Sequence, residues 1–269
     1  MTPGSTTPAK RYAILAAVLA TGALLALLAG CGGDEESTPP LVDIQPVTTT
    51  FVGAFTNGTE NGKVTIVIHA VTLARRFQAA RSLGPWRAGA TNAAAAATLK
   101  FAGGATRILT GSYDTVTDSL DVTDGTYRFH GEYDDTNPPP SMLGQYTGPN
   151  GAGGFGALNG GSVTPEIYLG SFQSDSTNVT GVFDLARCDT LARAIACPAG
   201  EDPAYLDGNA LGAGTIKAIT LSGGVPGSFD VTATGSLDTG AHTVSGAWHM
   251  YDYGMLKGDD GTWSGALSP

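Results

Sequence analysis

The sequence predicts an all-β protein, an antiparallel meander that closes as a β-barrel or, alternatively, packs as a β-sandwich. Three observations predict this fold. Short runs of alternating or β-branched residues recur at a spacing of about ten residues. Asp-Gly and Asn-Gly pairs lie between these runs, and most of the chain lacks helical periodicity. The 39 glycines follow no three-residue period, which excludes a collagen-like chain.

The strongest expected strand covers residues 63–71, a β-branched run that follows the turn pair Asn61-Gly62. The clearest hairpin surrounds Asp124-Gly125, and period two places Phe129 on the core face of its second strand. Further strands are expected at 95–101, 106–113, 142–147, 153–159, 165–172, 179–185, 215–222, 228–234, 242–251 and 262–266.

The N-terminus has the parts of a secretory signal, since the basic pair Lys10-Arg11 precedes an apolar run. This run ends in Leu28-Ala29-Gly30-Cys31, which resembles the bacterial lipobox. The resemblance implies that residues 1–30 are removed and that Cys31 is acylated, so that the mature protein is a lipoprotein of the cell envelope. Gly32 is similar to the residue found there in lipoproteins of the outer membrane. The alternative is an uncleaved membrane anchor over residues 12–30.

The mature chain divides into a tether and a β-rich domain. Residues 31–50 begin with an acidic, proline-containing stretch that cannot bury apolar surface, so we expect a disordered tether. Residues 51–269 are long enough for one large unit or for two sub-units near 51–160 and 161–269. Loss of Lys10 and Arg11 changes the net charge from -10 to about -12, which argues against binding to nucleic acid.

The cysteine count predicts one disulfide. With Cys31 assigned to lipid, Cys188 and Cys197 remain, and the extracytoplasmic compartment is oxidising. The alternatives are two free thiols or a metal pair. The segment 186–213 breaks the strand pattern, and its run Leu191–Ala196 is rich in alanine, so a single helical turn closed by the disulfide is expected there.

No motif specifies a reaction, a metal or a cofactor, and we assign no catalytic residue. Gly151–Gly156 matches G-x-G-x-x-G, but no helix can follow it. The four aspartates between Asp114 and Asp124 lack the order of ligands of an EF-hand. His130 and His249 occupy similar places after two related stretches, Gly-Ser-Tyr-Asp-Thr and Gly-Ser-Leu-Asp-Thr, and could meet across a barrel. The solvated-surface interpretation of these histidines is favoured.

One segment predicts a contact surface. Residues 73–94 hold the main basic concentration of an acidic chain, and arginine and tryptophan are enriched at interface centres. The alternative is a solvated loop whose arginines pair with carboxylates of the same protein. The candidate contact residues are Arg75, Arg76, Arg81, Trp86 and Arg87.

The stretch Gly144–Phe155 contains Gln-Tyr-Thr-Gly-Pro-Asn-Gly-Ala-Gly-Gly. It is similar to a pattern in the β-barrel lobes of transferrin-binding-protein-like surface lipoproteins. The resemblance implies an eight-stranded antiparallel barrel at the cell surface and does not extend to transferrin as the ligand. The sequence therefore predicts a non-enzymatic, lipid-anchored module that binds a protein or a small ligand. A polysaccharide hydrolase of the envelope and a structural coat lipoprotein are the alternatives.

Overall fold

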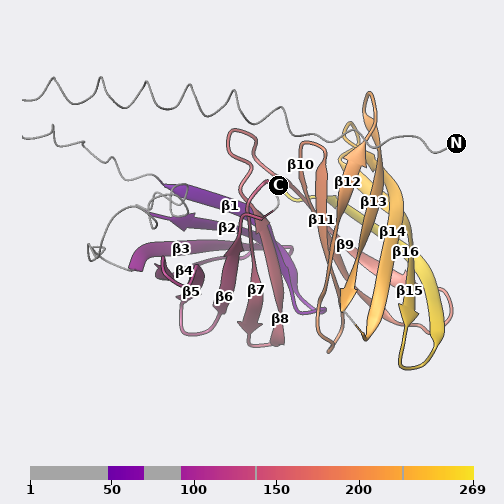
Figure 1. Ribbon diagram of the computed structural model, residues 1–269, viewed down its shortest axis with the longest axis horizontal. Coiled ribbons are helices and arrows are strands. Elements are labelled where there is room, and N and C mark those ends of the chain that lie inside the picture. The colour runs from indigo at the N-terminus through magenta and orange to yellow at the C-terminus, as the bar shows by residue number, and fades with distance from the viewer. Residues whose placement is uncertain (1–47, 70–91, 137, 226) are drawn as a thin grey trace, which may run out of the picture. The chain divides into compact units, whose positions relative to one another are not determined.

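The computed structural model describes residues 48–69, 92–136, 138–225 and 227–269. They belong to one compact unit, Gln45–Pro269, and contain 16 strands. The strands form two closed antiparallel barrels, β1–β8 and β9–β16 (Figure 1), which confirms the predicted all-β meander. The described part of the chain offers no helix that could cross a lipid bilayer.

In the first barrel each strand pairs with its neighbour in sequence, and β1 pairs with β8 to close the ring, with Phe55 opposite Phe155. Its strands are β1 (Thr49–Thr56), β2 (Asn61–Ile68), β3 (Asn92–Phe101), β4 (Thr106–Asp114), β5 (Ser119–Thr123), β6 (Arg128–Asp134), β7 (Ser141–Gly148) and β8 (Gly151–Leu158). Residues 70–91 of the β2–β3 connection lie outside the described residues.

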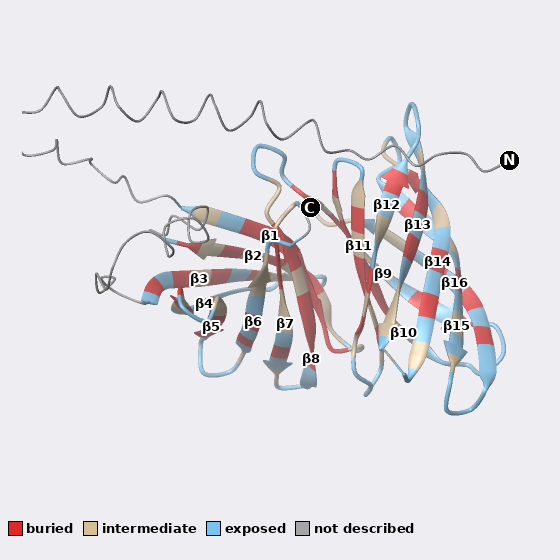
Figure 2. Ribbon diagram, in the orientation of Figure 1, coloured by how far each residue is buried: buried red, intermediate tan, exposed pale blue. Residues whose placement is uncertain are grey.

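The second barrel repeats this order, and β16 pairs with β9 to close it, with Trp263 opposite Phe172. Its strands are β9 (Glu166–Ser174), β10 (Thr180–Cys188), β11 (Leu191–Pro198), β12 (Ala204–Leu211), β13 (Ile216–Val225), β14 (Phe229–Asp238), β15 (Thr243–Asp252) and β16 (Lys257–Leu267). Buried and exposed residues alternate along β14 (Figure 2), as expected of a strand with one inward and one solvent-facing side.

The two Gly-Ser-x-Asp-Thr stretches share one turn chemistry. Asp114 and Asp238 each end a strand, and the Oδ1 atom of each accepts backbone N–H groups two and three residues further on. The fourth residue after each aspartate, Asp118 or His242, has a φ of 55° or 58°, and the next strand follows at once. Turn chemistry thus accounts for the internal similarity.

One face of each barrel packs against the other barrel. Val52 and Ala54 of β1 and Leu158 of β8 form a buried cluster with Ile167, Ala186 and Cys188 of β9 and β10. Two hydrogen bonds join the same surfaces: Asn61 Nδ2 donates to Asp184 Oδ1 at 2.8 Å, and Tyr205 Oη donates to the Gly144 carbonyl oxygen at 2.8 Å. Strands at this junction are therefore buried on both faces.

The predicted disulfide and helical turn are wrong. Cys188 and Cys197 are both free and buried, and they lie on paired strands with Cys188 opposite Leu191. Cys197 lies six residues further along β11, which separates the two by roughly 20 Å at about 3.3 Å per residue. A disulfide needs Cα atoms within about 7 Å. The expected helical turn is instead strand β11.

Candidate ligand cavity of the second barrel

A cavity of about 310 Å³ opens at one end of the second barrel. It lies where the β9–β10, β11–β12, β13–β14 and β15–β16 turns gather, because its lining includes Val179, Glu201, Phe229 and Met255. Its volume is near the lower end of the range of small-molecule sites, about 300–1,000 Å³. This end of the barrel therefore has space for a small ligand.

The walls are mainly apolar and aromatic. Phe172 and Trp248 meet edge to face with ring centroids 5.6 Å apart, and Phe183 stacks on Trp263 at 4.6 Å. Trp248 Nε1 donates to the Gln173 carbonyl oxygen at 3.2 Å, so the buried indole N–H is satisfied. A Cβ added at Gly261 would lie 2.6 Å from the indole of Trp248. The glycine thus leaves room for the ring to lie against the strand.

Small side chains on two strands account for the free space. The inward positions of β11 carry Ala192, Ala194 and Ala196, and β12 begins with Ala204. An alanine side chain ends at Cβ and cannot reach the middle of an eight-stranded barrel. Ala196 and Ala204 both line the cavity, which therefore extends towards these strands.

Four carboxylates surround the opening: Glu201, Asp202, Asp252 and Asp259. Asp259 is the most constrained of them. Its Oδ1 accepts from Ser174 Oγ at 3.0 Å, Ser176 Oγ at 2.6 Å and its own neighbour's N–H, and its Oδ2 accepts from Thr177 Oγ1 at 3.0 Å. Burial raises the pKa of Asp259, but the bonds from Ser176, Ser174, Thr177 and the Asp260 amide outweigh burial and lower this pKa. The carboxyl group therefore stays ionised.

Aromatic rings pack against one another inside the first barrel. Phe129 touches Phe155 with centroids at 4.8 Å and Tyr146 at 5.2 Å, and Phe55 lies 4.9 Å from Tyr146. A Cβ at Gly131 would approach the Phe155 ring to 2.5 Å, so the glycine makes space for that ring.

Glu60 lies in the β1–β2 turn of this barrel and accepts hydrogen bonds from Tyr146 Oη and Asn150 Nδ2. Burial, and then the Glu60 carboxylate, raise the pKa of Tyr146. The phenol therefore stays a neutral donor.

At the end of the second barrel opposite the cavity, Glu166, Tyr168 and Arg187 form a hydrogen-bonded polar group. Arg187 Nη1 and Tyr168 Oη both donate to Glu166 Oε2, at 2.6 Å and 3.1 Å. Burial, and then the neighbouring Glu166 charge, raise the pKa of Tyr168 to about 12. These three side chains bond to one another, and Arg187 Nε is buried without a hydrogen-bond partner among the described residues.

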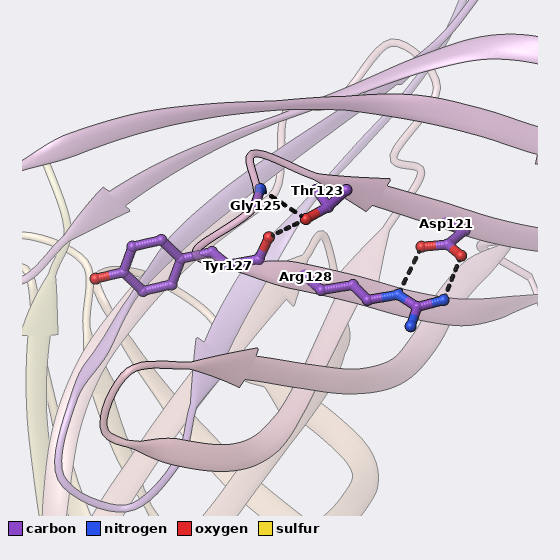
Figure 3. A network of polar contacts seen from close by, with 5 residues as sticks. All are labelled: Asp121, Thr123, Gly125, Tyr127 and Arg128. Carbon is purple, nitrogen blue, oxygen red and sulfur yellow. Dashed lines mark hydrogen bonds and ion pairs between the residues drawn. The ribbon is translucent and has the colours of Figure 1, made fainter.

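A second group of polar residues lies on the outer wall of the first barrel. Arg128 Nε and Nη2 donate to the two carboxylate oxygens of Asp121, and the Thr123 hydroxyl orders the adjoining turn through Gly125 and Tyr127 (Figure 3). The Arg128 bond lowers the pKa of Asp121. Both side chains are about half exposed, so the pair adds little to stability.

The structure separates the residues that the sequence singled out. His130 is exposed on β6 of the first barrel, whereas His249 is exposed on β15 of the second barrel and its Nδ1 pairs with Asp260 at 2.7 Å. The two histidines therefore form no common site. Asp114 and Asp118 serve one turn, whereas Asp124 accepts backbone N–H groups at the opposite end of β5.

Two predicted sites lie outside the described residues. They are the lipidation site Cys31 and the contact segment with Arg75, Arg76, Arg81, Trp86 and Arg87. The cavity was missed because its residues have ordinary core patterns. Phe229, Val231, Trp248 and Met250 alternate as an inward face should, and alternation does not reveal whether the interior is full.

Comparison with known proteins gives no family assignment. No protein-family model and no curated protein matches the chain. A solved protein of unknown function from the DUF3598 family of Nostoc punctiforme matches 84% of this chain and 96% of its own length, with 9% sequence identity and a TM-score of 0.18. A likeness this weak carries no functional argument.

Proposed function

We propose that this protein is a lipid-anchored binding module of the bacterial cell envelope, and that it holds a small apolar ligand in the mouth of its second barrel. The observation that carries the binding proposal is the cavity of about 310 Å³ with Phe172, Phe183 and Trp248 in its walls. Concave apolar pockets with a few polar groups are the usual form of a small-molecule site. The lipobox supports the location, with the membrane reached through acylated Cys31.

A titration with phenylbutanol tests the binding proposal. The full chain is reconstituted in phosphatidylcholine vesicles, so that no detergent competes for the cavity, and heat is corrected against protein-free vesicles. We expect saturable binding to the unmodified protein. Ala196→Phe should weaken it at least about tenfold, because the added ring occupies the cavity.

The matched control is Ala247→Phe, which makes the same change on the exposed face of β15. The control should bind phenylbutanol as the unmodified chain does. Equal binding by all three proteins, or no binding by the unmodified protein, would exclude the cavity as the ligand site.

Incorporation of an azide-bearing palmitate analogue tests the anchor. The unmodified chain should be labelled in growing bacteria and fractionate with membranes, and Cys31→Ser should lose the label. Labelling that persists in Cys31→Ser would place the lipid elsewhere, and an unlabelled natural chain would end the lipoprotein proposal.

A polysaccharide hydrolase is less well supported at this site. A glycosidase needs one carboxylic acid with a raised pKa to protonate the leaving group. Asp259, the most constrained carboxyl group of the cavity, has a lowered pKa. Its environment therefore suits a fixed negative charge better than a proton donor.

The contact segment remains a separate proposal that the sequence alone supports. Replacement of Arg75, Arg76, Arg81 and Trp86 together should leave phenylbutanol binding intact and abolish capture of an envelope protein partner. Unchanged capture by the fourfold variant would remove the assignment of this segment.

A further inference from the structure

We infer that the cavity selects a ligand whose apolar body carries a positive charge, and that Asp259 is the residue that recognises this charge. The inference rests on the proposed function, because it assigns a ligand class to the same cavity. Its starting point is a carboxylate that points into a barrel whose other inward residues are mainly apolar.

The strand pattern places Asp259 on the inward face of β16. Asp259, Gly261 and Trp263 are buried, whereas Asp260 and Thr262 between them are exposed. The side chain of Asp259 is therefore directed into the mouth of the barrel, where an ionised group loses much of its hydration. Four hydrogen bonds reduce the cost of this buried charge.

The partners of Asp259 among the described residues carry no charge. All of its hydrogen bonds come from neutral groups, the hydroxyls of Ser174, Ser176 and Thr177 and one backbone amide. Among the described residues, no ion pair includes Asp259 or another carboxylate of the opening. Lys257 lies opposite Asp252 in the β15–β16 ladder but forms no ion pair with it. A ligand cation would therefore be the first positively charged partner of this carboxylate among the described residues.

An aromatic ring lies beside this carboxylate. Met250 is opposite Asp259 and Trp248 is opposite Gly261, so Trp248 and Asp259 are diagonal neighbours on the inward face. Diagonal neighbours are roughly 7–8 Å apart. An ammonium group between them would meet the carboxylate on one side and the indole on the other, and both attract cations. Its apolar body would lie against Phe172 and Phe183.

Three probes of similar size and different charge test the inference on the full chain in phosphatidylcholine vesicles: phenylbutylamine, phenylbutanol and phenylbutyrate. The amine should bind about tenfold more tightly than the alcohol, because it gains both the carboxylate and the indole. The acid should bind more weakly than the alcohol. Equal affinities, or the reverse order, would overturn the inference.

Asp259→Asn removes the charge and keeps the size of the side chain. It should reduce the affinity for phenylbutylamine to that for phenylbutanol and leave the affinity for phenylbutanol unchanged. Asp189→Asn is the matched control, since Asp189 is exposed at the opposite end of the barrel and asparagine tolerates its φ of 56°. An amine advantage that survives Asp259→Asn would contradict the role of this residue.

A second variant covers the case in which Asp259→Asn does not fold. Glu201→Gln with Asp202→Asn removes two charges from the rim turn. This variant should lower amine affinity by about threefold and leave alcohol affinity unchanged. An unchanged amine advantage in this variant would count against charge recognition. If the alcohol itself fails to bind the natural chain, the proposed function fails; if only the amine advantage is missing, the further inference alone fails.

Discussion

The two barrels have the same strand order and closure, yet the described core of the first holds a dense group of aromatic rings and the second is open at one end. Both place alanine inward on their third strand. In the first barrel Ala93, Ala95 and Ala97 of β3 belong to a core with a dense group of aromatic rings. In the second barrel, Ala196 on β11 and Ala204 on β12 border a cavity.

An eight-stranded barrel therefore does not by itself determine whether its interior can hold a ligand. Its interior is just wide enough either to be filled by side chains or to hold one small ligand. The two interiors differ in the contacts between their aromatic rings. Phe55, Phe129, Phe155 and Tyr146 contact one another in the first barrel, whereas Phe172 and Phe183 each pair with a tryptophan beside the cavity.

The largest expected difference between the barrels comes from removing a ring. Phe129→Ala should lower the free energy of unfolding by about 3–5 kcal/mol, since the ring is fully buried among others. Phe172→Ala should cost about 2 kcal/mol, because one side of its ring already borders the cavity. Urea titration followed by circular dichroism measures both. Equal costs would show that the two interiors are packed alike.

Adding a ring should destabilise the first barrel and leave the stability of the second barrel almost unchanged. Ala97→Phe forces a ring into a core position where the natural side chain is fully buried, and should cost about 1–3 kcal/mol or more. Ala196→Phe should change the free energy of unfolding by less than about 1 kcal/mol, because the cavity accepts the ring. The same urea titration decides between these outcomes. A strongly destabilised Ala196→Phe would mean that the second barrel has no usable space.

The junction of the barrels predicts a pH dependence. Asp184 is buried, and its Oδ1 accepts from Asn61 and the Gly170 amide whereas its Oδ2 has no partner among the described residues. Burial raises the pKa of this carboxyl well above its usual range, against the lowering by the Gly170 and Asn61 bonds.

The native state therefore binds the proton of Asp184 more tightly than the unfolded state does. Stability should fall as pH rises from the unfolded pKa of about 3.9 towards the higher native pKa. The contribution of this group to the slope is at most about 1.4 kcal/mol per pH unit. Asp184→Asn should remove it, and Asp189→Asn should not. Parallel pH profiles for Asp184→Asn and the natural chain would refute this prediction.

The smallest expected effects concern two related turns. Leu256 has a φ of 50° and an exposed side chain, so Leu256→Gly should raise the free energy of unfolding by up to about 1 kcal/mol. Asp118 has a φ of 55° but accepts from Tyr113 Oη at 2.8 Å, so Asp118→Gly should lower it by about 1 kcal/mol. If both variants changed the free energy of unfolding in the same direction, backbone strain alone would account for the effects at both turns.

Most strands could be predicted because one of their faces is polar. Arg128–Asp134 of β6 alternates between polar and apolar residues, and Lys63–Ile68 of β2 is rich in β-branched residues. The strands β1, β11 and β12 were missed. β1 and β11 lie at the junction of the barrels, where both faces carry buried residues, whereas β12 alternates between buried and exposed residues and was missed all the same. Phe51 points into its barrel while Val52 packs against the other barrel, so the alternation disappears from the sequence.

The cavity and the disulfide depended on information that a sequence does not carry. Whether Ala196 borders a ring or a void is set by side chains from β9, β14 and β15. The prediction of a Cys188–Cys197 bridge assumed a compact loop. In the β10–β11 hairpin, Cys188 lies beside the turn and Cys197 lies near the other end, so the two thiols are far apart. The turns could be predicted from the sequence, because aspartate binds nearby backbone amides and this preference is local.

The most direct test of the account is a crystal structure of the chain soaked with a bromophenyl analogue of phenylbutanol, in which the bromine is located by its anomalous signal. The account predicts a peak in the second barrel between Phe172, Phe183 and Trp248, and none among the rings of the first barrel. A bromine in the first barrel, or none in the second at a concentration that saturates binding in solution, would contradict it.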